Sequence, residues 1–293
     1  MWEAVEQSIT SAIGQCFRIE TTNPVGGGCI HNAYKICGGG TSYFVKANRP
    51  KLTWMFEAEA SALKEIIATK TVRAPNPLCW GRTKNSSFLV MEWLSIQTHK
   101  ANSDRILGCR LAEMHRRVQP YFGWWQDNAI GSTKQTNTTH EEWVGFWLNQ
   151  RLGFQLNLAE NNGFLGNIQT TGRELMETLH GFFSDYQPVA SLLHGDLWGG
   201  NYAMDESGSP VVFDPASYYG DREADIAMTE LFGGFGSEFY AAYNDYFPLD
   251  WGYSTRKTLY NLYHIINHLN LFGGGYLAQA QSMVDALRAE LKN

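Results

Sequence analysis

The sequence predicts an α+β protein made of two lobes: a small N-terminal lobe with a β-sheet and one key helix, and a larger, mainly helical C-terminal lobe. Short β-type segments separated by turn residues occupy much of the first 93 residues, whereas apolar residues recur at helical spacing from about residue 103 onward. A polar motif at residues 194–201 follows a short apolar segment in the second lobe. We therefore divide the chain into lobes of residues 1–93 and 94–293.

The composition is that of a folded globular protein, with 44% hydrophobic and 14% aromatic residues among 293. The net charge of −6 argues against a nucleic-acid partner. We expect no membrane span, because no run of 18 apolar residues occurs, and no signal peptide, because Glu3 and Glu6 lie near the start. Five scattered cysteines without a C-x-x-C pair fit reduced thiols in the cytoplasm.

The N-terminal lobe begins with an amphipathic helix over residues 2–14, followed by a glycine-rich turn between two predicted strands. Glycine allows a backbone to approach a phosphate closely and to donate N–H groups to it. A plain hairpin turn explains the same residues equally well, so both interpretations stay open. The residues predicted to contact a nucleotide here are Gly26, Gly27, Gly28 and Cys29.

A lysine ends the next predicted strand, and a helix follows it. In protein kinases such a lysine contacts the ATP phosphates and pairs with a glutamate on the next helix. The lysine here is Lys46, and the helix offers Glu57 and Glu59. We choose Glu59, because it lies one turn before the inward-facing Leu63, and keep Glu57 as the alternative.

Two further strands, at residues 78–81 and 88–94, lead toward the second lobe. We expect Met91 to form a wall of an adenine pocket, and backbone groups near Glu92 and Leu94 to bind the adenine. This assignment rests on the order of the elements along the chain.

The C-terminal lobe is predicted to contain helices from about residue 103 to His115, at about 140–160 and 168–186, and along the apolar positions that begin at Leu259. His264 and His268 lie one turn apart on the last of these helices. Two histidines at this spacing can bind zinc, but no third ligand is apparent, so we favour packed or hydrogen-bonded histidines.

The motif at residues 194–201 carries the chemistry. His194, Asp196 and Asn201 have the spacing of the kinase catalytic loop H-R-D-x-x-x-x-N, with glycine in place of the arginine. Asp214 then follows a predicted strand, at the place of the kinase metal-binding aspartate. This pattern predicts a protein-kinase-like fold in which Asp196 is the catalytic base, and Asn201 and Asp214 hold Mg²⁺ against ATP. The alternative is a polar loop whose Asn and Gly make turns.

Charged residues follow at the start of another predicted helix. In small-molecule kinases an aspartate at this place often holds the catalytic loop by hydrogen bonds, so we expect this structural role for Asp225. We also expect Arg222 and Glu223 to form a pair that braces the loop.

The chain as a whole resembles the fructosamine kinase, or ketosamine-3-kinase, family within the aminoglycoside-phosphotransferase superfamily. The resemblance extends from about Pro24 to about Tyr276, and Trp198 is its best discriminator, because aminoglycoside kinases usually lack the Trp-Gly-Gly-Asn continuation. The segments that carry it are residues 27–30, 194–201, 214–216, 219–225, 231–235 and 267–273.

The resemblance implies ATP-dependent transfer to the 3-hydroxyl of ketosamines, the adducts of sugars with small amines or protein lysines. The labile 3-phosphate product then leads to deglycation, a form of protein repair. Trp198 is expected to line the sugar site, and its indole offers an apolar face and one N–H donor. Asp221 stands where the family usually has histidine, which bears on substrate preference.

Two other functions remain as alternatives: a phosphotransferase for an aminoglycoside or choline, and a nucleotide-binding pseudokinase. The sequence argues against the pseudokinase, because the lysine, both aspartates and the asparagine are all present.

Cys29 supports a separate hypothesis, since family members often carry cysteine at this place. Oxidation of its thiol in the phosphate loop would block ATP and link two copies, so the protein would be a monomer or a redox-dependent homodimer. A small buried apolar role is the alternative.

Overall fold

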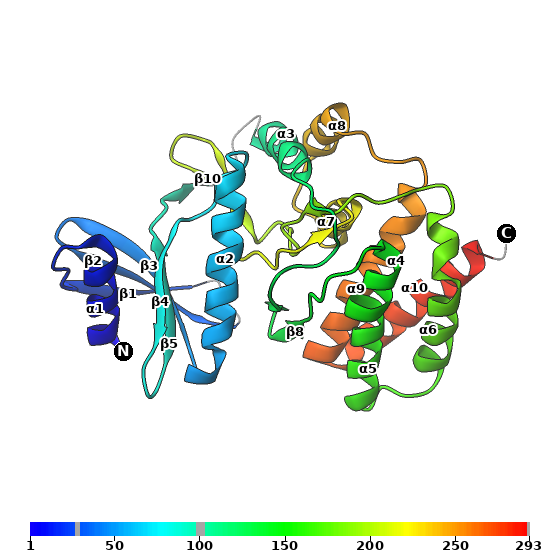
Figure 1. Cartoon of the computed structure of the whole chain (residues 1–293), viewed down its shortest axis with the longest axis horizontal. Helices are drawn as coiled ribbons and strands as arrows, with labels where there is room; N and C mark the ends of the chain where they lie inside the picture. The colour runs from blue at the N-terminus through cyan, green and yellow to red at the C-terminus, as the bar shows by residue number, and fades with distance from the viewer. Residues whose placement is uncertain (27–29, 98–102, 292–293) are drawn as a thin grey trace. The chain divides into compact units, whose positions relative to one another are not determined.

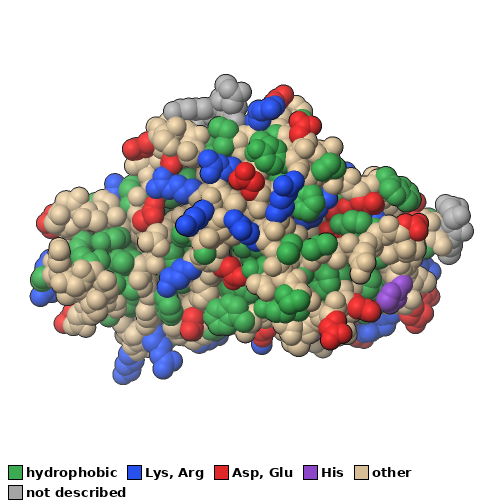
Figure 2. Space-filling view, turned by 45° about the horizontal axis from the view of Figure 1, so that its top comes forward, with side chains coloured by type: hydrophobic (Ala, Val, Ile, Leu, Met, Phe, Trp, Pro, Cys, Tyr) green, Lys and Arg blue, Asp and Glu red, His purple; other side chains and the backbone are tan. Residues whose placement is uncertain are grey.

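The structure is a computed structural model of the chain (Figure 1). The parts that it describes are residues 1–26, 30–97 and 103–291. Acidic and basic side chains lie among one another on the face drawn in Figure 2, in agreement with a modest net charge. No helix within the described ranges is long and apolar enough to cross a membrane.

The chain forms two compact units. The first unit comprises Met1–Ser103 and Tyr202–Pro215, and the second comprises Asp104–Asn201 and Ala216–Asn293. The predicted division into a nucleotide-binding lobe and a catalytic lobe at residue 93 stays a prediction.

The first unit is built on a five-stranded antiparallel sheet with the strand order β1-β2-β3-β5-β4. The turn between β2 and β3 consists of Gly39 and Gly40, both with positive φ, which is the backbone that a two-residue hairpin turn requires. The strands are β1 (Thr21–Val25), β2 (Asn32–Gly38), β3 (Thr41–Asn48), β4 (Pro77–Arg82) and β5 (Ser87–Glu92).

Two helices, α1 (Trp2–Ile13) and α2 (Thr53–Thr69), cover opposite faces of this sheet (Figure 1). Apolar residues of α1 form a buried cluster with Val45 of β3. Successive residues of a strand point to opposite faces, so Lys46 faces the other way, where it meets Glu59 of α2. A short 3-10 helix, η1 (Pro50–Leu52), connects β3 to α2.

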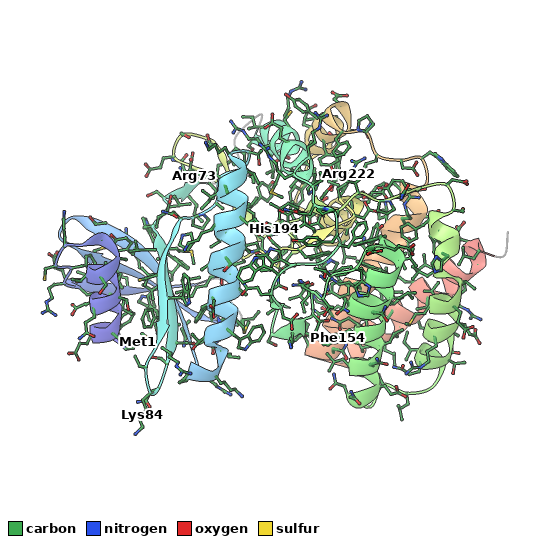
Figure 3. The ribbon with its side chains drawn as sticks, viewed as in Figure 1. Met1, Arg73, Lys84, Phe154, His194 and Arg222 are labelled. Carbon is green, nitrogen blue, oxygen red and sulfur yellow. The ribbon has the colours of Figure 1, made fainter. Side chains whose placement is uncertain are left out.

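A second, three-stranded sheet explains why Tyr202–Pro215 belongs to the first unit. Its order is β11-β10-β6, and Met204 pairs with Gln97 across 107 residues of sequence. Arg73 lies just beyond α2 (Figure 3) and bridges to this sheet through its carbonyl, which accepts from Val212 N at 2.9 Å. The strands are β6 (Ile96–Gln97), β10 (Tyr202–Asp205) and β11 (Pro210–Val212).

The second unit is mainly helical, and its longest helix is α9, which contacts α5, α7 and α10 (Figure 1). Its apolar positions recur at helical spacing, and eleven of its residues are buried. The helices are α3 (Ser103–His115), α4 (Trp143–Phe146), the π-helical segment η2 (Trp147–Leu152), α5 (Gly153–Asn161), α6 (Asn167–Thr178), the 3-10 segment η3 (Leu179–Phe183), α7 (Glu223–Leu231), α8 (Ser237–Tyr246), α9 (Tyr253–Phe272), the 3-10 segment η4 (Gly274–Tyr276) and α10 (Leu277–Glu290).

Two pairs of short strands complete this unit. β7 (Asn128–Ile130) pairs with β8 (Thr133–Gln135), and β9 (Ser191–Leu192) pairs with β12 (Tyr219–Gly220). The β9–β12 pair joins the segments on either side of residues 193–218, which include the predicted motif at residues 194–201.

The predicted helices are largely present, with differences at their ends. The helix expected at 140–160 is formed by α4, η2 and α5 in succession, with one π-helical stretch in the middle. The helix expected at 168–186 is α6, which becomes a 3-10 helix after Thr178 and ends at Phe183. Helix ends are set by local hydrogen bonding that apolar periodicity does not report.

Candidate functional site

The catalytic loop of the second unit is held by a buried carboxylate. Asp225 of α7 accepts the backbone N–H of His194 at 2.6 Å through Oδ2 and that of Gly195 at 2.8 Å through Oδ1. His115 of α3 meets the same carboxylate, with Nε2 3.1 Å from Oδ2. Burial raises the pKa of Asp225, but the hydrogen bond and the charge interaction with His115 lower it, and together with the other lowering interactions they outweigh burial. The pKa of Asp225 therefore lies below its usual value. The expectation that Asp225 holds this loop is confirmed.

Gly195, which stands where protein kinases have arginine, is required by its backbone conformation and by its close neighbours. Gly195 has φ +83°, and a Cβ at this position would lie 2.1 Å from Ala216 O. Ala216 is itself fixed, because its N–H donates to His194 O at 2.9 Å. Only glycine therefore fits between the loop and the segment that follows Pro215.

Asp196 and Asn201 lie together within this loop. Asn201 Nδ2 donates to Asp196 O at 2.8 Å and to Asp196 Oδ2 at 3.2 Å. These bonds direct the amide nitrogen toward Asp196, which leaves the amide oxygen as the group suited to a cation. Asp196 is half-buried, as a base that must meet a substrate hydroxyl requires.

Trp198 projects from the same loop and is 39% exposed. The glycines after it make room for this arrangement. A Cβ on Gly200 would lie 2.2 Å from the indole, and a Cβ on Gly199 would lie 3.1 Å from Gly233 O. The Trp-Gly-Gly sequence thus permits the indole to fold over its own loop.

The first unit brings together Lys46, Glu59 and Asp214. Lys46 Nζ lies 2.6 Å from Glu59 Oε1 and 2.5 Å from Asp214 Oδ1. Burial disfavours the ammonium, but the two carboxylates outweigh burial and raise the pKa of Lys46. Burial raises the pKa of Glu59 and the lysine opposes this rise. The predicted ion pair between Lys46 and Glu59 is present, so the choice of Glu59 over Glu57 agrees with the structure.

Asp214 has an unusual backbone for a residue with a side chain. Its φ is +57°, a left-handed conformation shared by one other non-glycine residue in the described part of the chain, Lys70. Such conformations cost free energy and gather at functional sites. The side chain of Asp214 is 49% exposed although it contacts the buried Lys46, so its carboxylate is accessible. A carboxylate oxygen, as in Asp214, and an amide oxygen, as in Asn201, are each hard donors of the kind that Mg²⁺ prefers, so both residues suit this metal.

The predicted adenine-binding residues also lie in the first unit. Met91 is buried and lies opposite Phe44 of β3, so it is on the same face of the sheet as Lys46. The N–H of Glu92 donates to Asn76 O at 2.9 Å, so of its two backbone groups only the carbonyl is suited to bind adenine. Leu94 lies two residues after the end of β5, outside any helix or strand.

The glycine-rich turn is described only at its start. Gly26 is exposed, and a Cβ there would meet no atom within 4 Å, so the space beside this backbone is open. The other three residues predicted to contact the nucleotide, Gly27, Gly28 and Cys29, lie outside the described residues.

The predicted pair between Arg222 and Glu223 is wrong. Glu223 is bound by Arg256 through two bonds of 2.7 and 3.0 Å, and Arg222 donates to the carbonyls of Phe247 and Pro248 instead. Neighbouring residues at the start of a helix point in different directions, which separates the two side chains.

Asp221, which departs from the resemblance, is fully buried. It accepts from Tyr260 Oη at 2.5 Å and Tyr186 Oη at 2.9 Å, and from Glu223 N at 3.0 Å. Burial raises its pKa. These bonds identify it as a structural acceptor within the helical core.

The two histidines of α9 do not form a metal site. His268 Nδ1 donates to His264 O at 2.8 Å, and within the described ranges no group of three His, Cys, Asp or Glu side chains is placed to hold a metal ion. Burial lowers the pKa of His264 to about 3. The contacts agree with the favoured interpretation of packed or hydrogen-bonded histidines: the His264 ring is buried, and the His268 ring is hydrogen-bonded.

Sequence reasoning missed the role of His115. Its Nδ1 lies 2.7 Å from Tyr243 Oη, and its Nε2 meets Asp225, so it connects α8 to the catalytic loop. A histidine at the end of an apolar helix face was the only local signal, and its partners lie 110 or more residues away.

These features define a class of protein. The chain aligns with the solved structure of the aminoglycoside phosphotransferase APH(4)-Ia, determined in complex with ADP and hygromycin B, at a TM-score of 0.64 and 14% identity, covering 97% of each chain. The fold is therefore protein-kinase-like, and the predicted fold class, with an N-terminal sheet and a mostly helical C-terminal region, is confirmed.

Closer comparisons identify the family. A family model for fructosamine kinase matches residues 1–290, and the chain belongs to this family. It is 45% identical to a probable ketoamine kinase of Synechocystis sp. over 97% of this chain and 95% of that one. It is 41% identical to the chloroplastic protein-ribulosamine 3-kinase of Arabidopsis thaliana over 95% and 86% of the two chains. A crystal structure of a Haemophilus somnus protein assigned as a fructosamine-3-kinase aligns at a TM-score of 0.91 and 28% identity, covering 98% and 97%.

Proposed function

We propose that this protein is an ATP-dependent kinase that phosphorylates the 3-hydroxyl of ketosamines. The observation that carries the proposal is the complete loop of residues 194–201, held by Asp225, in a chain whose full-length relatives include a probable ketoamine kinase and a protein-ribulosamine 3-kinase. The loop supplies a half-buried carboxylate, an amide oxygen and an exposed indole within six residues.

Asp196 acts as the base in this proposal. Its carboxylate orients the 3-hydroxyl and accepts its proton while the hydroxyl oxygen forms a bond to the γ-phosphorus of ATP. The bond between that phosphorus and the bridging oxygen breaks, and ADP leaves with the electron pair. Asn201 holds the Asp196 side chain in place through its amide nitrogen.

The first unit supplies the nucleotide-binding groups. Lys46 contacts the phosphates and is oriented by Glu59, which remains its partner when Asp214 turns to a cation. The adenine lies against Met91 and is bound by the Glu92 carbonyl and by backbone groups near Leu94. The residues of the glycine-rich turn contribute N–H groups to the phosphates.

Mg²⁺ would be held by Asp214 and Asn201, and when bound it neutralises charge on the phosphate oxygens. A half-exposed carboxylate and an amide oxygen are the groups that the chain offers for this purpose.

The sugar portion of the substrate lies against Trp198, whose flat apolar face suits a sugar ring. The 3-phosphate product is labile, so its loss releases the amine and completes deglycation. Because the described cysteines Cys16, Cys37, Cys79 and Cys109 are all unpaired, we place this repair reaction in the reducing cytoplasm.

The test is ATP consumption by the purified protein with ribulosyl-lysine and fructosyl-lysine, beside an aminoglycoside and choline, with and without Mg²⁺. We expect turnover of the ketosamines alone, only with Mg²⁺, and a phosphate at the 3-position by NMR. Asp196→Asn, which keeps the shape of the side chain, should abolish transfer and retain ATP binding. Asp245→Asn, at an exposed position of α8, is the matched control and should behave like the wild type.

Turnover of the aminoglycoside or choline in place of the ketosamines would refute the substrate assignment. Transfer by Asp196→Asn at the wild-type rate would refute the assignment of the base.

A further inference from the structure

The β7–β8 hairpin carries buried amide side chains that have no part in the proposed reaction. Asn128 begins β7 and Gln135 ends β8, and both are buried. An amide is costly to bury unless its hydrogen bonds are made, so the partners of these two side chains show what the hairpin holds. We call Gln135 and Asn128 the amide clamp.

The amide clamp holds two successive backbone carbonyls. Gln135 Nε2 donates to Ala216 O at 3.0 Å, and Asn128 Nδ2 donates to Ser217 O at 2.7 Å. Ala216 and Ser217 lie outside any helix or strand, and the clamp gives their carbonyls the donors that a neighbouring strand supplies within a sheet. The position of this irregular segment therefore depends on side chains of the hairpin.

The same segment is hydrogen-bonded to the catalytic loop. Ala216 N donates to His194 O at 2.9 Å. The carbonyl oxygen of Ala216 would lie 2.1 Å from a Cβ on Gly195, so the two backbones are as close as glycine permits. Ala216 is thus bonded to the loop through its N–H and to the clamp through its carbonyl. A shift of Ala216 would reach His194 and Gly195, the two residues directly before Asp196.

The orientation of the clamp is fixed by its partners. Tyr263 Oη donates to Gln135 Oε1 at 2.6 Å, which turns Gln135 Nε2 toward Ala216 O. Burial raises the pKa of Tyr263, so the hydroxyl keeps the proton that it donates. The two members of the clamp are joined as well, since Gln135 Nε2 also donates to Asn128 Oδ1 at 2.8 Å.

A buried arginine extends this network. Asn137 Nδ2 donates to Asn128 Oδ1 at 3.1 Å, and Arg151 Nη2 donates to Asn137 Oδ1 at 2.7 Å. A guanidinium group only donates, so fully buried Arg151 sets the direction of the amides that follow it. Rotation of either member of the clamp would leave a buried donor or acceptor unpaired, and this cost makes the clamp rigid.

We infer that the β7–β8 hairpin positions the catalytic base, because its amide clamp holds the Ala216 peptide against the loop that carries Asp196. This inference rests on the proposed function, in which Asp196 accepts the proton of the substrate hydroxyl. Gln135 and Asn128 are positioning residues that act through the backbone of residues 216 and 217. Apolar side chains would fill the same space at less cost, so the backbone that the clamp holds explains its donors.

The experiment removes the donors of the clamp and keeps the approximate shape of its side chains. Gln135→Met has no donor for Ala216 O. An error of about 1 Å at a catalytic group lowers kcat about a hundredfold, so we expect kcat with a ketosamine to fall about ten- to a hundredfold. KM for ATP should change less than about threefold, because Lys46 and Glu59 belong to the first unit. Asn128→Leu leaves the bond to Ala216 in place and should lower kcat less, by about three- to tenfold.

Gln169→Met is the matched control, because Gln169 is a buried glutamine of α6 in the same unit. Its Nε2, like that of Gln135, donates to two oxygens, here the carbonyls of Leu156 and Phe164, both at 3.0 Å. Both glutamine variants should lower the melting temperature by about 2–10 °C. Gln169→Met should leave kcat within about twofold of the wild type, which separates positioning of the base from a general loss of stability.

Amide hydrogen exchange gives a readout that does not depend on turnover. The Ala216 N–H should exchange about tenfold faster in Gln135→Met than in the wild type, and at the wild-type rate in Gln169→Met. If Gln135→Met does not fold, the same two measurements on Asn128→Leu decide the question.

Three results would overturn the inference: a wild-type kcat in the clamp variants, an equal fall of kcat in Gln169→Met, or exchange at Ala216 that the clamp variants leave unchanged. If the wild type turns over no ketosamine, the proposed function fails, and exchange at Ala216 alone decides whether the clamp holds the loop.

Discussion

Replacing Asp225 by Asn tests how the second unit holds its catalytic loop. The carboxylate of Asp225 accepts two backbone N–H groups, from His194 and Gly195, one on each oxygen. Asparagine offers one oxygen and one NH₂ group, so one backbone N–H would face another donor in a buried place. The change is therefore disruptive although it preserves the volume and shape of the side chain.

The magnitude follows from the burial of these groups. A hydrogen bond to a buried charge contributes about 1.5–3 kcal/mol, and an unsatisfied buried donor costs about 1–3 kcal/mol. We expect a loss of about 2–4 kcal/mol in the stability of the second unit, which corresponds to a decrease of about 5–10 °C in its melting temperature. A displaced loop also misplaces Asp196, and an error of about 1 Å in a catalytic group lowers kcat about a hundredfold.

The assay combines steady-state kinetics with differential scanning calorimetry. kcat should fall about a hundredfold while KM for ATP changes less than about threefold, because Lys46 and Glu59 belong to the other unit. Asp245→Asn on the surface of α8 controls for the loss of one negative charge. An Asp225→Asn variant that keeps kcat within about threefold of the wild type would show that the hydrogen bonds of Asp225 do not position the base.

Three further outcomes follow from the same structure. Glu59→Gln removes the buried ion-pair partner of Lys46 and should raise KM for ATP about tenfold in kinetic assays. Glu57→Gln, on the exposed face of the same helix, should leave KM for ATP unchanged, and equal effects of the two changes would contradict the pairing. Gly200→Ala should displace the Trp198 indole and raise KM for a ketosamine about tenfold with little change in melting temperature; an unchanged KM would refute the contact. His264 should destabilise the fold in acid. Its pKa is about 3 in the folded protein and about 6.5 in the unfolded chain, so the unfolded chain binds the proton first and stability is lost as pH falls below about 6.5. Urea titrations should show a loss of about 2 kcal/mol at pH 5, and a His264→Gln variant with the same pH slope would contradict this.

The pairing of Lys46 with Glu59 could be predicted because its determinants are local. A lysine at a strand end and a helix that follows directly place the partner within one or two turns, and the apolar periodicity of the helix selects which glutamate faces inward. The hydrogen bonds of Asp225 span 30 and 31 residues, so they could be predicted only because small-molecule kinases often have an aspartate with this role at the same place.

Contacts between distant segments could not be predicted in this way. Arg256 reaches Glu223 across 33 residues and His115 reaches Asp225 across 110. Both contacts depend on how the helices pack. From the sequence alone, any of several charged residues could equally well be the partner of Glu223 or Asp225. The nearest candidate for Glu223 in sequence, Arg222, was therefore the wrong one.

The glycines of residues 194–201 show why this motif identifies a fold as well as a reaction. Gly195 is required by the carbonyl of Ala216, Gly199 by the backbone at Gly233, and Gly200 by the indole of Trp198. These glycines have no side chain to contribute to the reaction, but each permits the close approach of a neighbour to the loop that carries Asp196 and Trp198. A side chain at position 200 would remove the space into which the indole folds. The orientation of the Trp198 indole therefore depends on a residue without a side chain, so a substitution at Gly200 should affect the sugar site as directly as one at Trp198 itself.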